Sequence, residues 1–168
     1  MKNKEPKKDR FEQLYQHHSN KVYRICTGYL QDENKVKDLF QQVMLNIWNN
    51  LESFRGEAQI TTWVYRITVN TAITFTKSEK RLNKRFRLEA DFTDIEDDNH
   101  SSFSPDLLPR LQKLNDCIHQ LDKQNRIIIT LYLEGLSYSD IGKVVGISEN
   151  YVGVKINRIK KELDQLMR

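Results

Sequence analysis

Residues 136–160, LSYSDIGKVVGISENYVGVKINRIK, are the stretch that decides the fold of this 168-residue chain. Residues 138–145 predict a short amphipathic helix, and Gly146-Ile147-Ser148 predicts a tight turn. Ser148 is placed to cap a second helix, whose apolar residues recur at helical spacing on one face: Val152, Ile156, Ile159, Leu163 and Leu166. Two helices joined by a short turn with a glycine are typical of a helix-turn-helix, which places its second helix in the major groove of DNA.

The opposite face of that second helix carries the side chains that would read DNA. Residues near the start of a recognition helix meet base edges. Asparagine pairs with adenine, and arginine or lysine pairs with guanine or phosphate. The exposed candidates are Glu149, Asn150, Tyr151, Lys155, Asn157 and Arg158, and Arg126 on the preceding helix is a candidate contact to the DNA backbone. A helical hairpin with no role on DNA has the same pattern and stays open as an alternative.

The rest of the chain is predicted to be all-α, because it has only 6 glycines and 3 prolines and shows long stretches of 3.6-residue periodicity. We predict two small helical domains, at residues 10–87 and 110–168, joined by a flexible acidic linker at 88–109. Residues 1–87 hold 17 basic and 9 acidic residues, residues 88–109 hold 0 and 7, and residues 110–168 hold 10 and 7. This distribution suggests two lobes that face DNA and a linker that DNA repels.

Within the first domain we predict one or two helices at residues 10–31, a helix at 33–52 capped by Asp32, and a loop at 53–61. A long helix follows at about 62–87. Its many β-branched residues favour a strand, but no partner sheet is visible elsewhere in the sequence, so we predict a helix.

The predicted helix at 33–52 has two different faces on a helical wheel. One is a core stripe: Val36, Phe40, Val43, Met44, Ile47 and Leu51. The other holds an acid, two amides and two bare apolar groups: Asp38, Gln41, Gln42, Leu45 and Trp48. Apolar groups among amides, turned away from the core, suggest a protein-binding surface. Alternatively, Leu45 is an ordinary exposed leucine and Trp48 turns inward.

A polar stripe on the long helix suggests nucleic-acid binding. It consists of Trp63, Arg66, Asn70, Lys77, Arg81 and Lys84. Basic groups at helical spacing can follow a phosphate backbone, and an aromatic ring beside them can stack on an unpaired base. The loop just upstream, from Phe54 to Ile60, adds an aromatic ring and an arginine. A solvated helix face, with Trp63 packed in the core, is the alternative.

Several classes of function find no support in the sequence. Cys26 and Cys117 lie in apolar helical patterns, which favours two buried thiols in a reducing cytoplasm. We see no metal-ligand spacing, nucleophile or phosphate loop, so we expect no cofactor, no metal and no enzymatic activity. No signal peptide and no membrane-spanning apolar run are visible, so we expect a cytoplasmic protein without membrane insertion.

Taken together, these segments resemble a bacterial RNA polymerase sigma factor of the extracytoplasmic-function (ECF) group of the sigma-70 family. The resemblance covers about residues 10–87 and 110–168. It is carried by Asp38-Leu39-Phe40-Gln41, by Phe54-Arg55-Gly56-Glu57 with Thr62–Ile67 and Asn70, and by Gly135–Tyr138 with Gly146–Glu149. The chain departs from the family at Gln42, where an acidic residue is usual, and at Ile60, where an aromatic residue is common.

The resemblance implies specific roles for three groups of residues. Core RNA polymerase would bind Asp38, Leu39, Gln41, Gln42, Leu45 and Trp48. The promoter −10 element would be opened and held by Phe54, Arg55, Ile60, Thr62, Trp63, Arg66, Asn70, Lys77 and Arg81. The −35 element would be bound by Arg126, Ser148, Glu149, Asn150, Tyr151, Lys155 and Arg158.

The partners implied are core RNA polymerase, promoter DNA and an inhibitory anti-sigma factor. A stand-alone helix-turn-helix regulator that binds an operator as a dimer is the main alternative. A helical adaptor is the next alternative, and an enzyme comes last.

Overall fold

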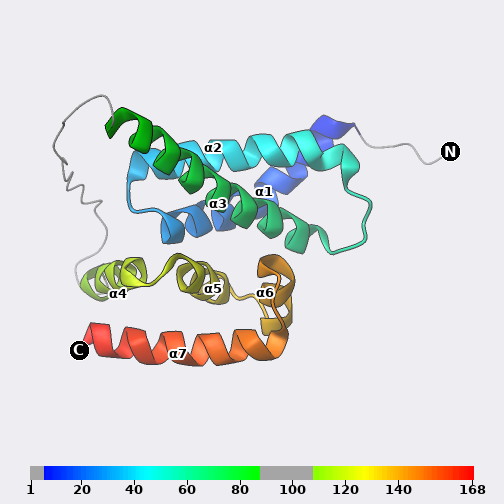
Figure 1. Cartoon of the computed structure of the whole chain (residues 1–168). Helices are drawn as coiled ribbons and strands as arrows, with labels where there is room; N and C mark the ends of the chain where they lie inside the picture. The colour runs from blue at the N-terminus through cyan, green and yellow to red at the C-terminus, as the bar shows by residue number, and fades with distance from the viewer. Residues whose placement is uncertain (1–5, 88–107) are drawn as a thin grey trace.

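The computed structural model describes residues 6–87 and 108–168, which form helices joined by short turns (Figure 1). The first group contains α1 (Lys7–Tyr29), α2 (Glu33–Asn50), a 3-10 turn η1 (Leu51–Ser53) and α3 (Ile60–Arg87). The second group contains α4 (Leu108–Gln120), α5 (Lys123–Leu133), α6 (Tyr138–Val145) and α7 (Glu149–Met167). The predicted all-α class and the helix-turn-helix, formed by α6 and α7, are confirmed.

Some predicted boundaries were wrong by a few residues. The first region begins with a single helix that starts at Lys7, so Lys7–Arg10 are helical. The loop before α3 ends at Gln59, two residues earlier than predicted. The predicted linker at 88–109 lies outside the described residues except for its last two, Leu108 and Pro109, which already belong to α4.

Side-chain caps begin four of the helices. Asp32 accepts a hydrogen bond from the Lys35 amide at 3.0 Å, and Asp122 caps α5 in the same way. Ser137 and Ser148 cap the two helices of the helix-turn-helix; Ser148 accepts from the Tyr151 amide at 3.3 Å. Each cap satisfies an amide that the helix itself leaves unpaired, which is why the helices begin at these residues.

The long helix α3 forms despite its β-branched composition because it is buried along one side. Its core face consists of Val64, Tyr65, Thr68, Val69 and Ala72, all at most 3 % exposed. The Thr68 hydroxyl donates to the Val64 carbonyl at 2.9 Å, and Thr74 and Thr76 also bond carbonyls one turn back. Tertiary burial outweighs local strand propensity here, and the hydroxyls satisfy themselves within the helix.

Gly142 and Gly146 shape the helix-turn-helix. Gly146 ends α6 with a φ of +79°, a conformation that side chains disfavour. A Cβ atom added to Gly142 would lie 2.6 Å from the Ile147 carbonyl oxygen, so the backbone of the turn packs directly on α6. Around this turn, Ile141, Val152, Ile156 and Ile159 are completely buried.

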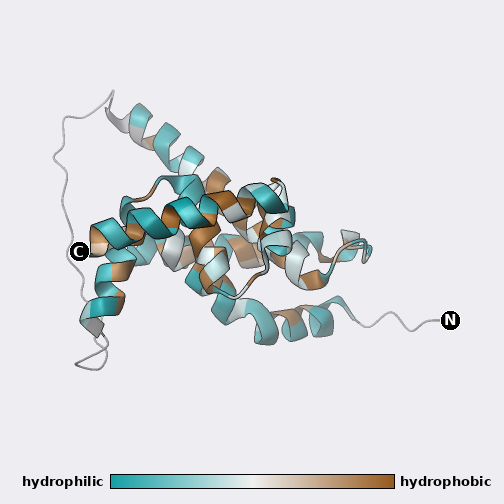
Figure 2. Cartoon of the chain, turned by 90° about the horizontal axis from the view of Figure 1, so that it is seen from below, coloured by the Kyte–Doolittle hydropathy of each residue, from teal (hydrophilic) through white to brown (hydrophobic). Residues whose placement is uncertain are grey.

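The two groups of helices are packed against each other, with α5 on α1 and α6 on α3 (Figure 1). Apolar segments gather where the helices face one another, and hydrophilic segments lie outside (Figure 2). Cys26 and Cys117 are both buried free thiols, as predicted. The core is continuous through both groups, an arrangement for which the sequence contains no signal.

Candidate polymerase and nucleic-acid interfaces

The outward face of α2 is open, as the helical wheel predicted. Asp38, Gln41 and Gln42 are exposed, and the Leu45 side chain is 55 % exposed. Gln42 donates to Asn46 at 3.2 Å, and Asn46 in turn donates to Thr71 on α3 at 2.9 Å. These hydrogen bonds link the outward face of α2 to α3. The exposed Leu45 therefore lies beside amide side chains that are hydrogen-bonded.

Two residues predicted for this face lie elsewhere. Leu39 is completely buried, because it is one residue, or about 100°, away from Asp38 and so points into the core. Trp48 is half-buried: it meets the Phe11 ring edge-on at 5.3 Å between centroids, and the Lys7 ammonium lies 4.5 Å from its ring. Leu39 therefore cannot touch a partner in this arrangement, and Trp48 can offer a partner only the exposed part of its side chain.

An aromatic pair brackets the loop before α3, with Phe54 at the start of the loop and Trp63 in the first turn of α3. The Phe54 and Trp63 rings lie 5.1 Å apart, tilted by 47°, and both are half-buried. Ile60 is also half-buried, and Arg55 is exposed. Thr62, predicted to contact DNA, is only 5 % exposed, because it lies on the core side of the helix that bears Trp63.

A cavity of about 580 Å³ lies between this loop and α1. Its walls bring Phe54, Ile60 and Tyr65 together with cationic or titratable groups that the sequence analysis did not single out: Arg10, His17, His18 and Lys21. Burial lowers the pKa of His18, and His17 and Lys21 lower it further. The basic residues of α1 could have been noticed as a stripe, but only the fold shows that they face the loop.

The polar stripe of α3 is exposed at Arg66, Asn70, Lys77 and Arg81. Arg66 is engaged, since its guanidinium donates to the Lys143 carbonyl at the end of α6 at 2.9 Å. Asn70 lines a second cavity, of about 300 Å³, together with residues of α5 and α6.

The predicted reading face of α7 is open to solvent. Glu149, Asn150 and Arg158 are exposed, and Tyr151 is 45 % exposed. Ser148 is exposed, but its hydroxyl oxygen is occupied as the cap of α7.

Lys155 is held across to α5. Its ammonium donates to Gln124 and Asn125, each at 3.0 Å. Its charge therefore lies at a fixed place beside the reading face.

Arg126 is half-buried and its guanidinium is engaged by backbone carbonyls, which argues against its predicted contact to the DNA backbone. Its guanidinium donates to the Tyr29 carbonyl at 2.9 Å, to His119 at 2.6 Å and to Leu121 at 3.1 Å. Burial lowers its pKa. With three carbonyl partners and a half-buried position, Arg126 ties α5 to the end of α1.

Among residues 6–87 and 108–168, no cluster of three or more His, Cys, Asp or Glu side chains is arranged to hold a metal ion. None of the helices in this part of the chain has the length and apolar character needed to cross a membrane.

Comparison with known proteins assigns both groups of helices. Residues 14–82 match the family model described as Sigma-70 region 2, and residues 111–163 match Sigma-70, region 4. The ECF RNA polymerase sigma-E factor of Escherichia coli (strain K12) is 30 % identical over 162 residues, covering 89 % of this chain and 81 % of that protein. The chain belongs to the ECF sigma factors of the sigma-70 family.

Other relatives agree with this membership. The sigma factor is 29 % identical to the ECF RNA polymerase sigma-E factor of Haemophilus influenzae, over 94 % of this chain and 87 % of the relative. It is 25 % identical to SigW of Bacillus subtilis, over 95 % of this chain and 90 % of the relative. It therefore directs promoter-specific transcription, and a stand-alone operator-binding regulator is not favoured.

Solved structures share the fold. The sigma factor RpoE of Bartonella quintana, solved in complex with the anti-sigma factor NepR, superposes with a TM-score of 0.72 at 19 % identity, covering 94 % of this chain and 96 % of that one. CnrH, solved with the cytosolic domain of CnrY, has a TM-score of 0.68 at 20 % identity and covers 94 % of this chain and 86 % of that one.

Proposed function

We propose that this sigma factor docks on core RNA polymerase through the outward face of α2. The observation that carries the proposal is Leu45, which is 55 % exposed although the rest of the helix buries its apolar residues on the other side. Asp38, Gln41 and Gln42 surround it with polar groups that can bond a partner. An apolar centre within a polar rim is the usual composition of a protein interface.

The proposal assigns the −10 element to the loop before α3 and to the exposed stripe of α3. Phe54, Ile60 and Trp63 supply apolar surface on which an unpaired base can stack, while Arg55, Arg66, Lys77 and Arg81 supply charge for the phosphates. Asn70 adds an amide that can bond a base edge. This combination of rings and cations suits a single strand, which offers an open base face.

The same proposal assigns the −35 element to α7. Asn150 and Arg158 are exposed on the side opposite the buried face of this helix. Glu149, Tyr151 and Lys155 lie on the same side, with Lys155 positioned by α5. A helix with its N-terminal residues free and its apolar face anchored has the form of a recognition helix in duplex DNA.

We further propose that the protein acts in the cytoplasm as a binding subunit without a catalytic site of its own, and that an anti-sigma factor holds it inactive. The similar sigma factor RpoE of Bartonella quintana, solved in complex with the anti-sigma factor NepR, supports the last point. The residues 88–109 would then serve as the connection between the two DNA-binding regions.

Reconstituted transcription tests the docking face. Core polymerase from the native host, supplied with the purified chain, should initiate at specific genomic sites that core enzyme alone ignores. Leu45→Arg and Asp38→Ala should abolish complex formation while the helical spectrum stays unchanged. Leu82→Arg is the matched control, because Leu82 is 54 % exposed but lies on α3. Equal polymerase binding by Leu45→Arg and the control would refute this docking face.

A further inference from the structure

An aliphatic side chain that the sequence analysis did not single out occupies the centre of the reading face of α7. Val154 is 46 % exposed, although Val152 and Ile156 on the core side of the same helix are completely buried. Val154 follows Val152 by two residues, or about 200° around the helix, so its side chain points away from the core of the second region. A single exposed valine is common on protein surfaces, so its significance depends on its neighbours.

The residues on either side of Val154 fix the direction in which it points. Gly153 faces α6, because an added Cβ atom would lie 3.5 Å from the ring of Tyr138. Lys155 faces α5, where its ammonium donates to two amide side chains at 3.0 Å. Val154 lies about 100° from each of these two neighbours and therefore points away from both helices, into solvent.

Groups that can bond base edges lie before and after Val154 on the same side of α7. Asn150 and Arg158 are both exposed, and each is four residues, about one helical turn, from Val154. The Tyr151 ring lies towards Lys155, whose ammonium is 5.8 Å from the ring centroid. A row of an amide, an aliphatic group and a guanidinium thus follows the middle of the face that is proposed to enter the major groove.

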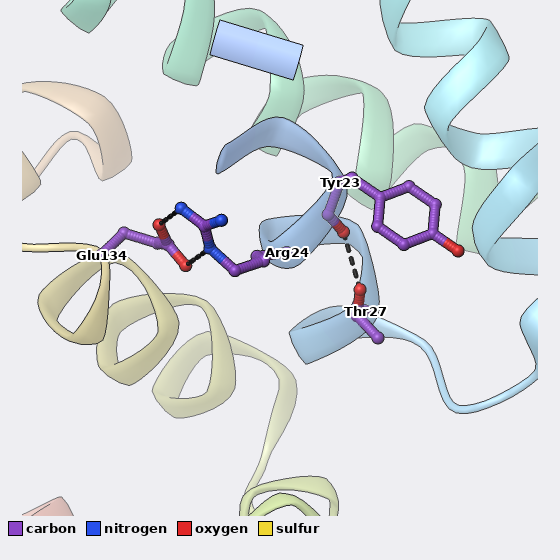
Figure 3. A network of polar contacts seen from close by, with 4 residues as sticks. All are labelled: Tyr23, Arg24, Thr27 and Glu134. Atoms are coloured by element: carbon purple, nitrogen blue, oxygen red, sulfur yellow. Dashed lines mark hydrogen bonds and ion pairs between the residues drawn. The ribbon is translucent and has the colours of Figure 1, made fainter. Parts of the chain in front are cut away.

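In the described part of the chain, the contacts that join the two regions leave this row uncovered. Arg24 of α1 donates to both carboxylate oxygens of Glu134, just after α5, at 2.7 and 2.8 Å (Figure 3). The helix α7 packs against α4, α5 and α6 and forms the outer layer of the molecule (Figure 1). A DNA duplex can therefore approach the row without displacing any of these helices.

The major groove offers one apolar group to such a side chain. Of the four bases, only thymine carries a methyl group there, on C5, and apolar side chains contact it directly. A valine cannot hydrogen-bond a base edge. The favourable contact left to it in the groove is burial against that methyl group.

We propose that Val154 reads a thymine in the −35 element by burying the C5-methyl group of that base. This inference rests on the proposed role of α7 in binding the −35 element. Asn150 lies about 6 Å from Val154 along the helix axis, because each residue rises about 1.5 Å. That distance corresponds to about two base-pair steps of about 3.4 Å. The thymine therefore lies within about two base pairs of the base that Asn150 contacts.

Removing the methyl group from the DNA tests the contact without changing the protein. Core polymerase from the native host, carrying the full-length chain, is bound to a promoter at which it initiates transcription. Each thymine of the −35 element, on either strand, is replaced in turn by deoxyuridine, which keeps every hydrogen-bonding group and lacks only the methyl group. At one position at least, the wild-type complex should bind about fourfold less tightly, the loss expected for one buried methyl group.

Val154→Ala then connects the methyl group to this side chain. The substitution removes two methyl groups and raises the helix propensity, so the fold is retained. At the sensitive position, the variant should bind the thymine and deoxyuridine promoters equally. Leu133→Ala is the matched control, because it truncates an aliphatic side chain that is 55 % exposed on α5, and it should keep the full difference between the two promoters.

The possible failures are distinguishable. If no exchange of thymine for deoxyuridine weakens binding, or if the difference persists in Val154→Ala, the reading of thymine by Val154 is overturned. Replacing the whole −35 element tests the proposed function separately. If this replacement leaves binding unchanged, the assignment of α7 to the −35 element falls. If the replacement weakens binding while no single exchange does, the role of α7 stands and Val154 does not read thymine.

Discussion

Gly28 lies where α1 crosses α5, and replacing it with alanine perturbs the contact between the two regions without altering a charge. The new methyl group would lie 2.5 Å from Oγ1, 2.7 Å from Cγ2 and 3.2 Å from Cβ of Thr130. Thr130 is only 7 % exposed and β-branched, so its side chain has little freedom to turn away. The helices would have to separate by about 1 Å to restore an ordinary contact distance of about 3.5 Å.

Two opposing effects set the magnitude. Overpacking of this kind costs about 1–3 kcal/mol, while exchanging glycine for alanine stabilises a helix by up to about 1 kcal/mol. The gain in helix stability applies to α1 whether or not the regions are in contact. It therefore does not offset the overpacking, which destabilises only the packed form. Gly28→Ala should therefore shift the equilibrium between packed and separated regions towards separation by about 5- to 150-fold.

Scattering and thermal unfolding, measured on the wild type and three variants, check this reasoning. Gly28→Ala should enlarge the radius of gyration, and the added mutation Thr130→Ala should reverse the enlargement, because only the 3.2 Å contact with Cβ then remains. Thr130→Ala alone should be nearly neutral, since the buried Thr130 hydroxyl has no hydrogen-bond partner among the described residues.

The cycle should yield a coupling free energy of about 1 kcal/mol or more. A Gly28→Ala chain that stays compact, gains thermal stability and shows no coupling with Thr130→Ala would refute the close approach.

Three further predictions concern pH, salt and capping. Burial, followed by repulsion from the Arg126 guanidinium, lowers the pKa of His119 from 6.5 to about 4. The folded chain then binds this proton less readily than the unfolded chain, so the free energy of unfolding should be at its full value above pH 6.5 and fall as the pH drops towards 4. His119→Gln should reduce this loss in thermal unfolding curves. Lys77→Ala should weaken promoter binding by the polymerase complex at every sequence tested and reduce the slope of log K against log salt by about 1, whereas an unchanged slope would remove Lys77 from the phosphate path. Ser148→Ala should lower the free energy of unfolding by about 1 kcal/mol in urea titrations, since the Tyr151 amide loses its cap; an unchanged midpoint would show that the cap contributes nothing.

Local features of the structure follow closely from the sequence. Asp32 and Ser148 were placed as caps from residue type and position alone, and both accept the expected amide hydrogen bonds. The exposed Leu45 was identified from a helical wheel. These predictions succeed because capping and periodicity involve residues that are at most a few positions apart, so their geometry is set by the helix itself.

The prediction of site residues failed where every residue of a sequence motif was assigned to the same surface. Leu39 and Thr62 lie within sequence motifs of the family, yet both point into the core. Neighbouring residues on a helix differ by about 100° in direction, so a run of consecutive residues cannot all share one face. Arg126 failed for a different reason, because its carbonyl partner on Tyr29 is 97 residues away and leaves no local trace.

The sequence by itself determined the helices, their caps, the helix-turn-helix and the family of the chain. Only the tertiary structure decided that α5 and α6 lie against α1 and α3, with Arg24 meeting Glu134 across 110 residues of sequence. The physical reason is that a helix requires only its own backbone bonds and one apolar stripe. Contact between two helical regions depends instead on single matched pairs, such as two opposite charges or a glycine that leaves room for a side chain of the other region. The order of residues along the chain does not show which distant residue is the partner.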